Sequence, residues 1–194
     1  MNAIYIILIL LQAGILVFFV SRAIKAWRAK NKALPPSLGP YELFRQASLG
    51  VTPVQLQLTM SPSVLKVYGV VTDWDLNGTV LTLSTYINGA ANAALSNGAS
   101  ITGGGKNPAV AEQASVLVQL AQDFVPRAVP AVAGGVLVPG TVRFYLLTNQ
   151  GLYAAQELLS SIQEETSPWT PLFFTANLVL SEIKKGEVAE AENV

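Results

Sequence analysis

The sequence contains neither cysteine nor histidine. Without cysteine the chain has no disulfide framework, no thiolate nucleophile and no thiolate metal site. Without histidine it lacks the commonest general base and the commonest ligand of transition metals, which excludes most hydrolase and metalloenzyme designs. The composition therefore predicts a protein that is not an enzyme and that holds no cofactor and no metal ion.

Charge is missing from the start of the chain, where the first charged side chain is Arg22. Residues 3–20, AIYIILILLQAGILVFFV, are apolar throughout except for Gln12. About 18 residues at roughly 1.5 Å each form a helix of about 27 Å, close to the roughly 30 Å hydrocarbon core of a bilayer. A secretory signal would carry positive charge before the run and a small-residue cleavage site after it, and a buried helix would carry a polar stripe. The sequence has none of these features, so we expect a retained transmembrane helix and a single-pass membrane protein.

Positive charge is concentrated directly after this run. The predicted membrane-interface residues are Arg22, Lys25, Trp27, Arg28, Lys30 and Lys32. Because basic residues stay on the cytoplasmic side, we expect the N-terminus outside the cell membrane and the rest of the chain in the cytoplasm. Tryptophan suits the membrane interface, and the basic side chains can lie against the anionic head groups of the lipid bilayer. A simpler interpretation gives the basic residues no role beyond that of a topology signal.

Positive charge is scarce in the rest of the chain. Five of the twelve basic residues precede residue 33, which leaves seven against twelve acidic residues. A protein that binds phosphate backbones needs lysine and arginine clustered on one face. Here the basic residues are scattered singly, apart from Lys184 and Lys185. We therefore expect no nucleic-acid partner.

The chain after the anchor is long enough for one domain. Residues 1–32 form the anchor with its basic extension, and the prolines Pro35, Pro36 and Pro40 predict a stiff spacer over residues 33–40. A domain is expected over residues 41–186, followed by an acidic, disordered tail over residues 187–194. The domain is predicted to begin with a short helix over residues 41–47. A strand is predicted over residues 54–60, where apolar and polar side chains alternate.

The clearest local signal is a hairpin at Asn77-Gly78 between two runs rich in β-formers. Both central residues of a type I′ turn need positive φ, which Asn and Gly tolerate, so the turn fixes the register. The predicted pairs are Leu76 with Thr79, Trp74 with Leu81, and Thr72 with Leu83. Further strands are expected at residues 90–96 and 99–102, where small side chains indicate that another element packs close.

Two longer helices are predicted. The first begins with Asn107 as N-cap and Pro108 in the first turn, and the second follows Ser167 and Pro168 and ends at Gly186. Between them, an apolar loop over residues 125–139 leads into a second hairpin around residues 149–151. The expected fold class is therefore α+β, with an antiparallel sheet, a meander plus a hairpin, covered by two main helices.

A glycine-rich loop precedes the first of these helices. It consists of Gly103, Gly104, Gly105 and Lys106. Backbone N–H groups and the helix dipole attract anions at such a place, which makes an anion-binding loop one interpretation. The spacing is not that of a Walker loop, so a flexible connection between strand and helix is the simpler alternative.

Asp73 and Asp75 form the second candidate group. Their spacing places two carboxylates on one face of a strand, as a hard cation or an acid–base pair requires. Together with Thr82 and Ser84 they mark the more polar face of the hairpin. We favour the interpretation that they lie on a solvated outer face, because no third acidic ligand lies nearby in the sequence.

The anchor decides the functional hypothesis. It confines the domain to the membrane plane and raises its effective concentration toward any membrane partner. We expect a non-enzymatic scaffold subunit whose cytoplasmic domain makes protein–protein contacts in a membrane complex or forms a homo-oligomer. Residues 125–139 and the aromatic residues Tyr145, Tyr153 and Trp169 are the expected contact regions. The alternative is a membrane-tethered sensor with a small-ligand pocket over the small residues Gly89, Ala91, Ala93 and Ala94.

Overall fold

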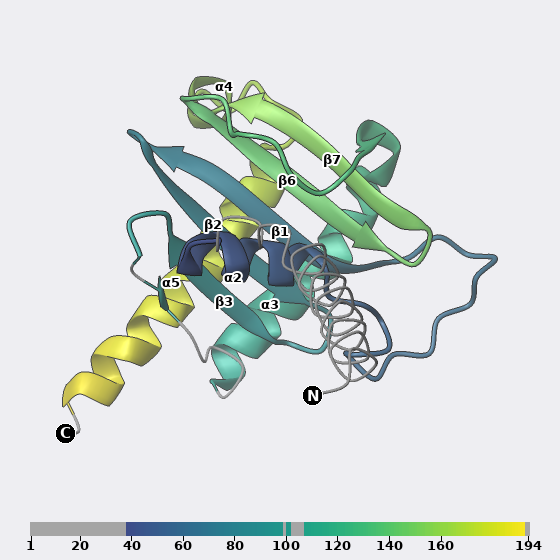
Figure 1. The fold of residues 1–194 in the computed structure, drawn as a ribbon, viewed down its shortest axis with the longest axis horizontal. Coiled ribbons are helices and arrows are strands. Elements are labelled where there is room, and N and C mark those ends of the chain that lie inside the picture. Colours follow the sequence, from purple (N-terminus) through teal and green to yellow (C-terminus); the bar gives the residue numbers. More distant parts are fainter. Residues whose placement is uncertain (1–37, 99, 102–106, 193–194) are drawn as a thin grey trace, which may run out of the picture. The chain divides into compact units, whose positions relative to one another are not determined.

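A computed structural model describes residues 38–98, 100–101 and 107–192 (Figure 1). The predicted anchor in residues 3–20, the basic cluster in residues 22–32 and the glycine-rich loop in residues 103–106 lie outside the described residues, so these predictions stay predictions. Among the described residues, no helix combines the length and the apolar character needed to cross a bilayer. One compact unit begins at Gly39.

This unit is an α+β domain, as predicted, and its described strands form one antiparallel sheet. The order across the sheet is β4-β3-β2-β1-β6-β7-β5 (Figure 1). The strands are β1 (Val67–Leu76), β2 (Thr79–Tyr86), β3 (Ala91–Leu95), β4 (Ser100–Ile101), β5 (Val129–Pro130), β6 (Thr141–Thr148) and β7 (Gly151–Leu158). The helices are α2 (Pro40–Leu49), α3 (Pro108–Ala121), the 3₁₀ helix η2 (Gln122–Arg127), α4 (Leu159–Gln163) and α5 (Thr170–Glu192).

The two predicted hairpins form the centre of the sheet. Trp74 pairs with Leu81 and Thr72 with Leu83, which confirms the register predicted from the Asn77-Gly78 turn. Both turn residues have the expected positive φ, 54° and 91°. Strands β6 and β7 form the second hairpin, and β6 pairs with β1, so the two hairpins lie side by side.

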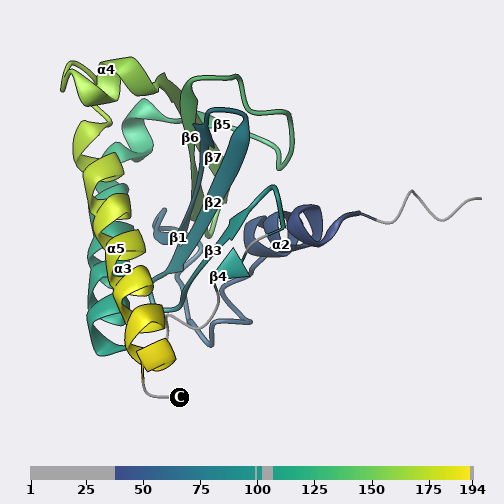
Figure 2. The ribbon, with the colours of Figure 1, turned by 90° about the vertical axis from the view of Figure 1, so that its left-hand side faces the viewer.

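Helices α3 and α5 cover one face of the sheet (Figure 2). They bury the main core, in which Leu117 of α3 and Leu172 of α5 meet Leu83 and Phe144 of the sheet. The N-cap of α3 is confirmed, because the Asn107 side chain accepts a hydrogen bond from the Ala109 N–H at 3.0 Å. The buried face of each helix follows the predicted 3.6-residue spacing.

The opposite face of the sheet is also covered, by α2 and the segment that follows it (Figure 2). A second apolar cluster lies there, with Leu49 of α2 against Val71, Tyr86 and Tyr145 of the sheet. The sequence predicts a polar, solvated face here. This prediction was wrong, because Val71 and Tyr86 of the hairpin itself and Tyr145 of β6 also lie on this face, and these side chains need a covering layer.

Two boundaries differ from the predictions. No strand forms over residues 54–60: residues 53–57 form turns, residues 58–60 have no regular secondary structure, and Gln57 has a φ of 57°, which breaks an extended conformation. The side chains of Leu56, Leu58 and Met60 still pack on the second cluster, so the alternation reflects one-sided packing without strand pairing. Helix α5 continues to Glu192, beyond its predicted end at Gly186. One glycine costs a helix only about 1 kcal/mol, and the following alanines and glutamates favour helix.

Candidate functional site

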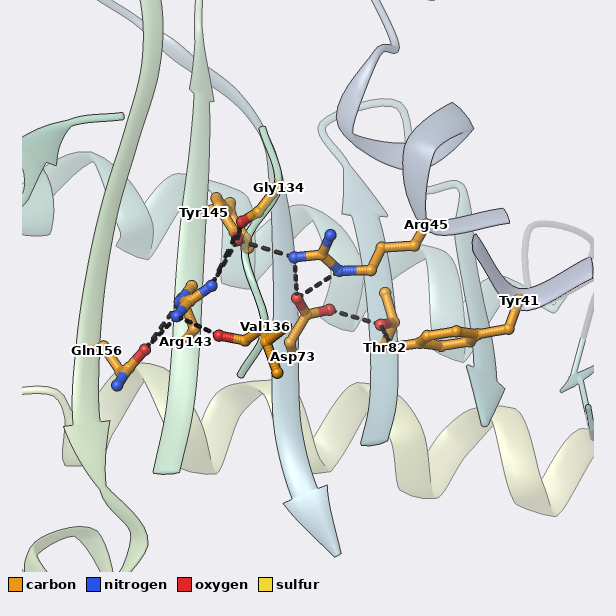
Figure 3. Close-up of polar contacts among 9 residues, drawn as sticks. All are labelled: Tyr41, Arg45, Asp73, Thr82, Gly134, Val136, Arg143, Tyr145 and Gln156. Carbon is orange, nitrogen blue, oxygen red and sulfur yellow. Dashed lines mark hydrogen bonds and ion pairs between the residues drawn. The ribbon is translucent and has the colours of Figure 1, made fainter. Parts of the chain in front are cut away.

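A row of polar side chains crosses four neighbouring strands beneath α2 (Figure 3). It consists of Thr82 on β2, Asp73 on β1, Arg143 on β6 and Gln156 on β7, each paired in register with the next. The register predicted from the Asn-Gly turn thus brings Asp73 beside Thr82, and the pairing of β1 with β6 adds the arginine. We call these residues, with Tyr41, Arg45 and Tyr145, the polar network.

Asp73 is the buried acidic group of the network, with 1% of its surface exposed. Arg45 of α2 directs Nε and Nη2 to the same oxygen, Oδ2, each at 2.7 Å. The Thr82 hydroxyl donates to the other oxygen, Oδ1, at 2.5 Å. Both carboxylate oxygens are therefore occupied. Burial alone would lower the pKa of Arg45, but its hydrogen bond to Asp73 and the charge of that carboxylate outweigh this and raise it.

Tyr41, also on α2, extends the network at one end. Its hydroxyl lies 2.9 Å from the Thr82 Oγ1. Because Thr82 gives its one proton to Asp73, Tyr41 is the donor in this pair. Burial is the main cause that raises the pKa of the Tyr41 hydroxyl, which keeps this donor protonated at neutral pH. Two side chains of α2 thus contact the sheet: Arg45 bonds directly to the Asp73 carboxylate, and Tyr41 bonds to the Thr82 hydroxyl that donates to it.

The Tyr145 hydroxyl joins the two arginines. It accepts hydrogen bonds from Arg45 Nη2 at 2.8 Å and from Arg143 Nη1 at 3.2 Å, and it donates to the Gly134 carbonyl at 3.0 Å. A hydroxyl has one proton and two lone pairs, so all of its hydrogen-bonding capacity is used. The ring itself is buried in the second apolar cluster.

Arg143 holds a surface segment that we call the valine strap, residues 131–140. Its Nη2 donates to the Val136 carbonyl at 3.1 Å and its Nη1 to the Gly134 carbonyl at 3.4 Å, while Nε and Nη2 contact Gln156 Oε1 at 2.9 and 2.5 Å (Figure 3). No carboxylate pairs with Arg143 among the described residues. The strap is thus fixed to the sheet through its backbone, which leaves its side chains free to face outward.

The strap presents apolar side chains to solvent. Val132 is 87% exposed and Val136 is 90% exposed, and Val138 is also exposed. No charged residue occurs between Arg127 and Arg143. Residues 125–139, predicted as a contact surface, thus include most of this apolar, outward-facing strap. Of the three aromatic residues predicted beside it, Tyr145 and Trp169 are buried in the cores and Tyr153 is partly buried.

The aspartate pair does not form the site that its spacing suggested. Asp75 accepts hydrogen bonds from the Gly78 N–H at 2.8 Å and the Gly140 N–H at 2.9 Å, so it stabilises the hairpin turn and the end of the strap. Asp73 is buried and paired, so the prediction of a solvated face was wrong for it. In the described part of the chain, no three acidic side chains come together as a metal site requires.

The small residues predicted to line a ligand pocket have another role. Ala91 and Ala93 are buried in the main core, and a Cβ at Gly89 would lie 2.7 Å from the Ala111 Cβ of α3. These small side chains let the helix pack close against the sheet, as the sequence indicated. None of the four residues lines the cavity at the start of β1, and the sensor hypothesis stays a prediction.

Sequence reasoning missed Arg45 and Arg143, and it missed that the Tyr145 hydroxyl bonds to both of them. One signal was present: a charged residue in the middle of a strand that is otherwise apolar is almost never buried without a partner. That rule predicts a partner for Asp73 but does not identify it.

The chain matches no protein-family model, no curated protein and no solved structure in comparisons with known proteins.

Proposed function

We propose that the protein is a membrane-anchored, non-enzymatic interaction subunit whose folded domain docks on a protein of a membrane complex through the valine strap. The observation that carries this proposal is the strap itself, which exposes apolar side chains while its backbone is held by the buried Tyr145 and the half-buried Arg143. An exposed apolar patch on a rigid support is typical of protein interaction sites. The anchor predicted from residues 3–20 would confine this patch to the membrane.

The polar network supplies the rigidity that docking needs. A loop that is already ordered loses less conformational entropy on binding than a mobile one. The strap is ordered by three hydrogen bonds from Arg143 and Tyr145 to the carbonyls of Gly134 and Val136. The absence of charge in the strap fits an apolar partner surface, since no charged group would have to be desolvated on contact.

The test compares two valines of similar exposure in different loops. Val136 lies in the strap, and Val54, 82% exposed, lies in the loop between α2 and β1. The full chain and its variants Val136→Asp and Val54→Asp would be extracted from membranes in mild detergent and separated by size-exclusion chromatography with mass spectrometry. We expect the wild type and Val54→Asp to elute in a complex of fixed composition, and Val136→Asp to lose its partner.

Both substitutions should leave thermal stability nearly unchanged, because changes at exposed positions usually stay within about 0.5 kcal/mol. A complex that contains only copies of this chain, and that Val136→Asp dissociates, would make the partner a second copy. The proposal would be wrong if Val136→Asp eluted in the same complex as the wild type, or if the wild-type chain eluted alone as a monomer.

A further inference from the structure

A cavity of about 600 Å³ lies at the end of the sheet where β1 begins. Its apolar wall includes Leu58 and Met60 of the loop between α2 and β1, and Val67 and Val118 of the main core. It thus opens where the loop passes from one face of the sheet to the other. Its volume is in the range of small-molecule sites, about 300–1,000 Å³.

The loop that forms one wall of the cavity is held in place by several side chains, among which Asn149 makes the most hydrogen bonds, while Gln150 donates to the Pro62 carbonyl at 3.0 Å. Asn149, in the turn between β6 and β7, donates to the Ser61 carbonyl at 2.7 Å and to the Val64 carbonyl at 2.9 Å, and accepts from the Lys66 N–H at 2.8 Å. On the other wall, Gln122 accepts from the Val67 N–H at 2.9 Å. The cavity is therefore formed before any ligand arrives.

The charge of the cavity comes from one residue. Lys66 is the charged residue among the described residues that line it, and its ammonium group has no ion-pair partner in the described ranges. No aromatic ring lines the cavity in these ranges, so a flat ligand has nothing to stack on. Its wall combines aliphatic and thioether side chains with the uncharged polar side chains of Thr59, Ser61, Gln119 and Gln122. These features together call for a ligand with an aliphatic body and a single negative charge.

We propose that this cavity binds a medium-chain fatty acid, with the acyl chain against Leu58, Met60 and Val64 and the carboxylate paired with Lys66. This site is separate from the valine strap and does not depend on the proposed docking function. Each methylene that leaves water contributes about 0.8 kcal/mol, which corresponds to about fourfold in affinity. Affinity should therefore rise about fourfold for each added methylene until the chain fills the cavity.

The test is photolabelling of the full chain in lipid nanodiscs with a diazirine-bearing decanoic acid, followed by peptide mapping. We expect label in the peptides that contain residues 58–66 and 118–122. Excess decanoate should compete for the label, octanoate about fifteenfold more weakly for two fewer methylenes, and decanol far more weakly because it carries no charge.

Two substitutions separate the lysine from a general effect of charge. Lys66→Gln should reduce labelling of these peptides at least fivefold, and Lys66→Arg should retain most of it. Lys184→Gln removes another exposed lysine, on α5, and should leave the labelling unchanged. Equal competition by decanol and decanoate, labelling that Lys66→Gln does not reduce, or label confined to other peptides would each overturn the proposal.

Discussion

Asp73 and Arg45 differ in their access to water, so loss of one partner affects the other differently. Asp73 lies in the middle of a central strand and has no path to water, whereas Arg45 is on a surface helix with 17% of its side chain exposed. A buried carboxylate without its cation retains the full cost of desolvation. At the scale of single residues, loss of Arg45 should therefore lower the stability of the domain more than the partial exposure of Arg45 suggests.

We expect Arg45→Met to lower the free energy of unfolding by about 3 kcal/mol, because it leaves Asp73 buried with only the Thr82 hydroxyl. Replacing both partners by apolar residues, in Arg45→Met with Asp73→Leu, should recover at least half of this loss. The measurement is urea denaturation of the full chain in mild detergent, followed by tryptophan fluorescence, because Trp74 and Trp169 are buried in the main core and report on the domain.

This prediction fails in either of two ways. A loss below about 0.5 kcal/mol for Arg45→Met would place the pair among surface ion pairs, which contribute little. A double variant less stable than Arg45→Met would show that the cost does not come from the uncompensated carboxylate.

At the scale of elements, the contact between α3 and the turn after β2 depends on Gly89. Its φ of 85° is unfavourable for other residues, and a Cβ there would lie 2.7 Å from the Ala111 Cβ. Gly78, in the first hairpin, has a similar φ of 91° but no atom within 4 Å of a built Cβ. Substitutions at the two glycines can therefore be compared to distinguish the cost of backbone strain from the cost of crowding against α3.

We expect Gly78→Ala to cost about 1–2 kcal/mol, the strain of a left-handed residue. Gly89→Ala should cost about 1–3 kcal/mol more, because the added methyl group also overpacks the contact with α3. Adding Ala111→Gly to Gly89→Ala removes the 2.7 Å contact but leaves the Ala111 Cα at 3.0 Å and its carbonyl oxygen at 3.2 Å. Once the helix cost of Ala111→Gly, about 1 kcal/mol, is measured separately, the double variant should recover part of the crowding cost. Equal losses for the two single variants would show that α3 moves away freely.

Local signals in the sequence predicted those elements whose geometry depends on neighbouring residues. The Asn77-Gly78 turn fixed the register of β1 with β2, and Asn107 with Pro108 marked the start of α3. The prediction failed at residues 54–60, because alternation reports that one side is buried but not whether a strand partner exists. Which strand pairs with a segment, or which helix packs against it, is decided by tertiary packing.

The polar network could not be predicted for the same reason. Asp73 and Arg45 are separated by 28 positions in the sequence, and Arg45 and Tyr145 by 100. These contacts require α2 to lie across the sheet and β6 to pair with β1. No local pattern in the sequence predicts either arrangement. The valine strap was easier to find, since it lies largely within residues 125–139, which the sequence predicts as an apolar loop.

At the scale of the whole domain, the Tyr145 hydroxyl connects β6 with α2, which is far away in the chain, and with the valine strap, which directly precedes β6. It accepts hydrogen bonds from Arg45 of α2 and from Arg143 of its own strand, and it donates to the Gly134 carbonyl of the strap. A change at this one oxygen should therefore reach both the helix that follows the spacer and the proposed docking surface. Tyr68 lies on the same face of the sheet, but its hydroxyl donates only to the Val51 carbonyl, at 2.8 Å.

We expect Tyr145→Phe to lower the free energy of unfolding by about 1–3 kcal/mol, because it leaves two guanidinium donors and one carbonyl without this partner. Hydrogen exchange of the full chain in nanodiscs should become faster in both α2 and the valine strap, since each loses a bond to the same group. Tyr68→Phe should speed exchange only near Val51. Faster exchange in the strap alone would mean that α2 is held by Asp73 without help from Tyr145, and that the strap moves independently of the helix next to the spacer.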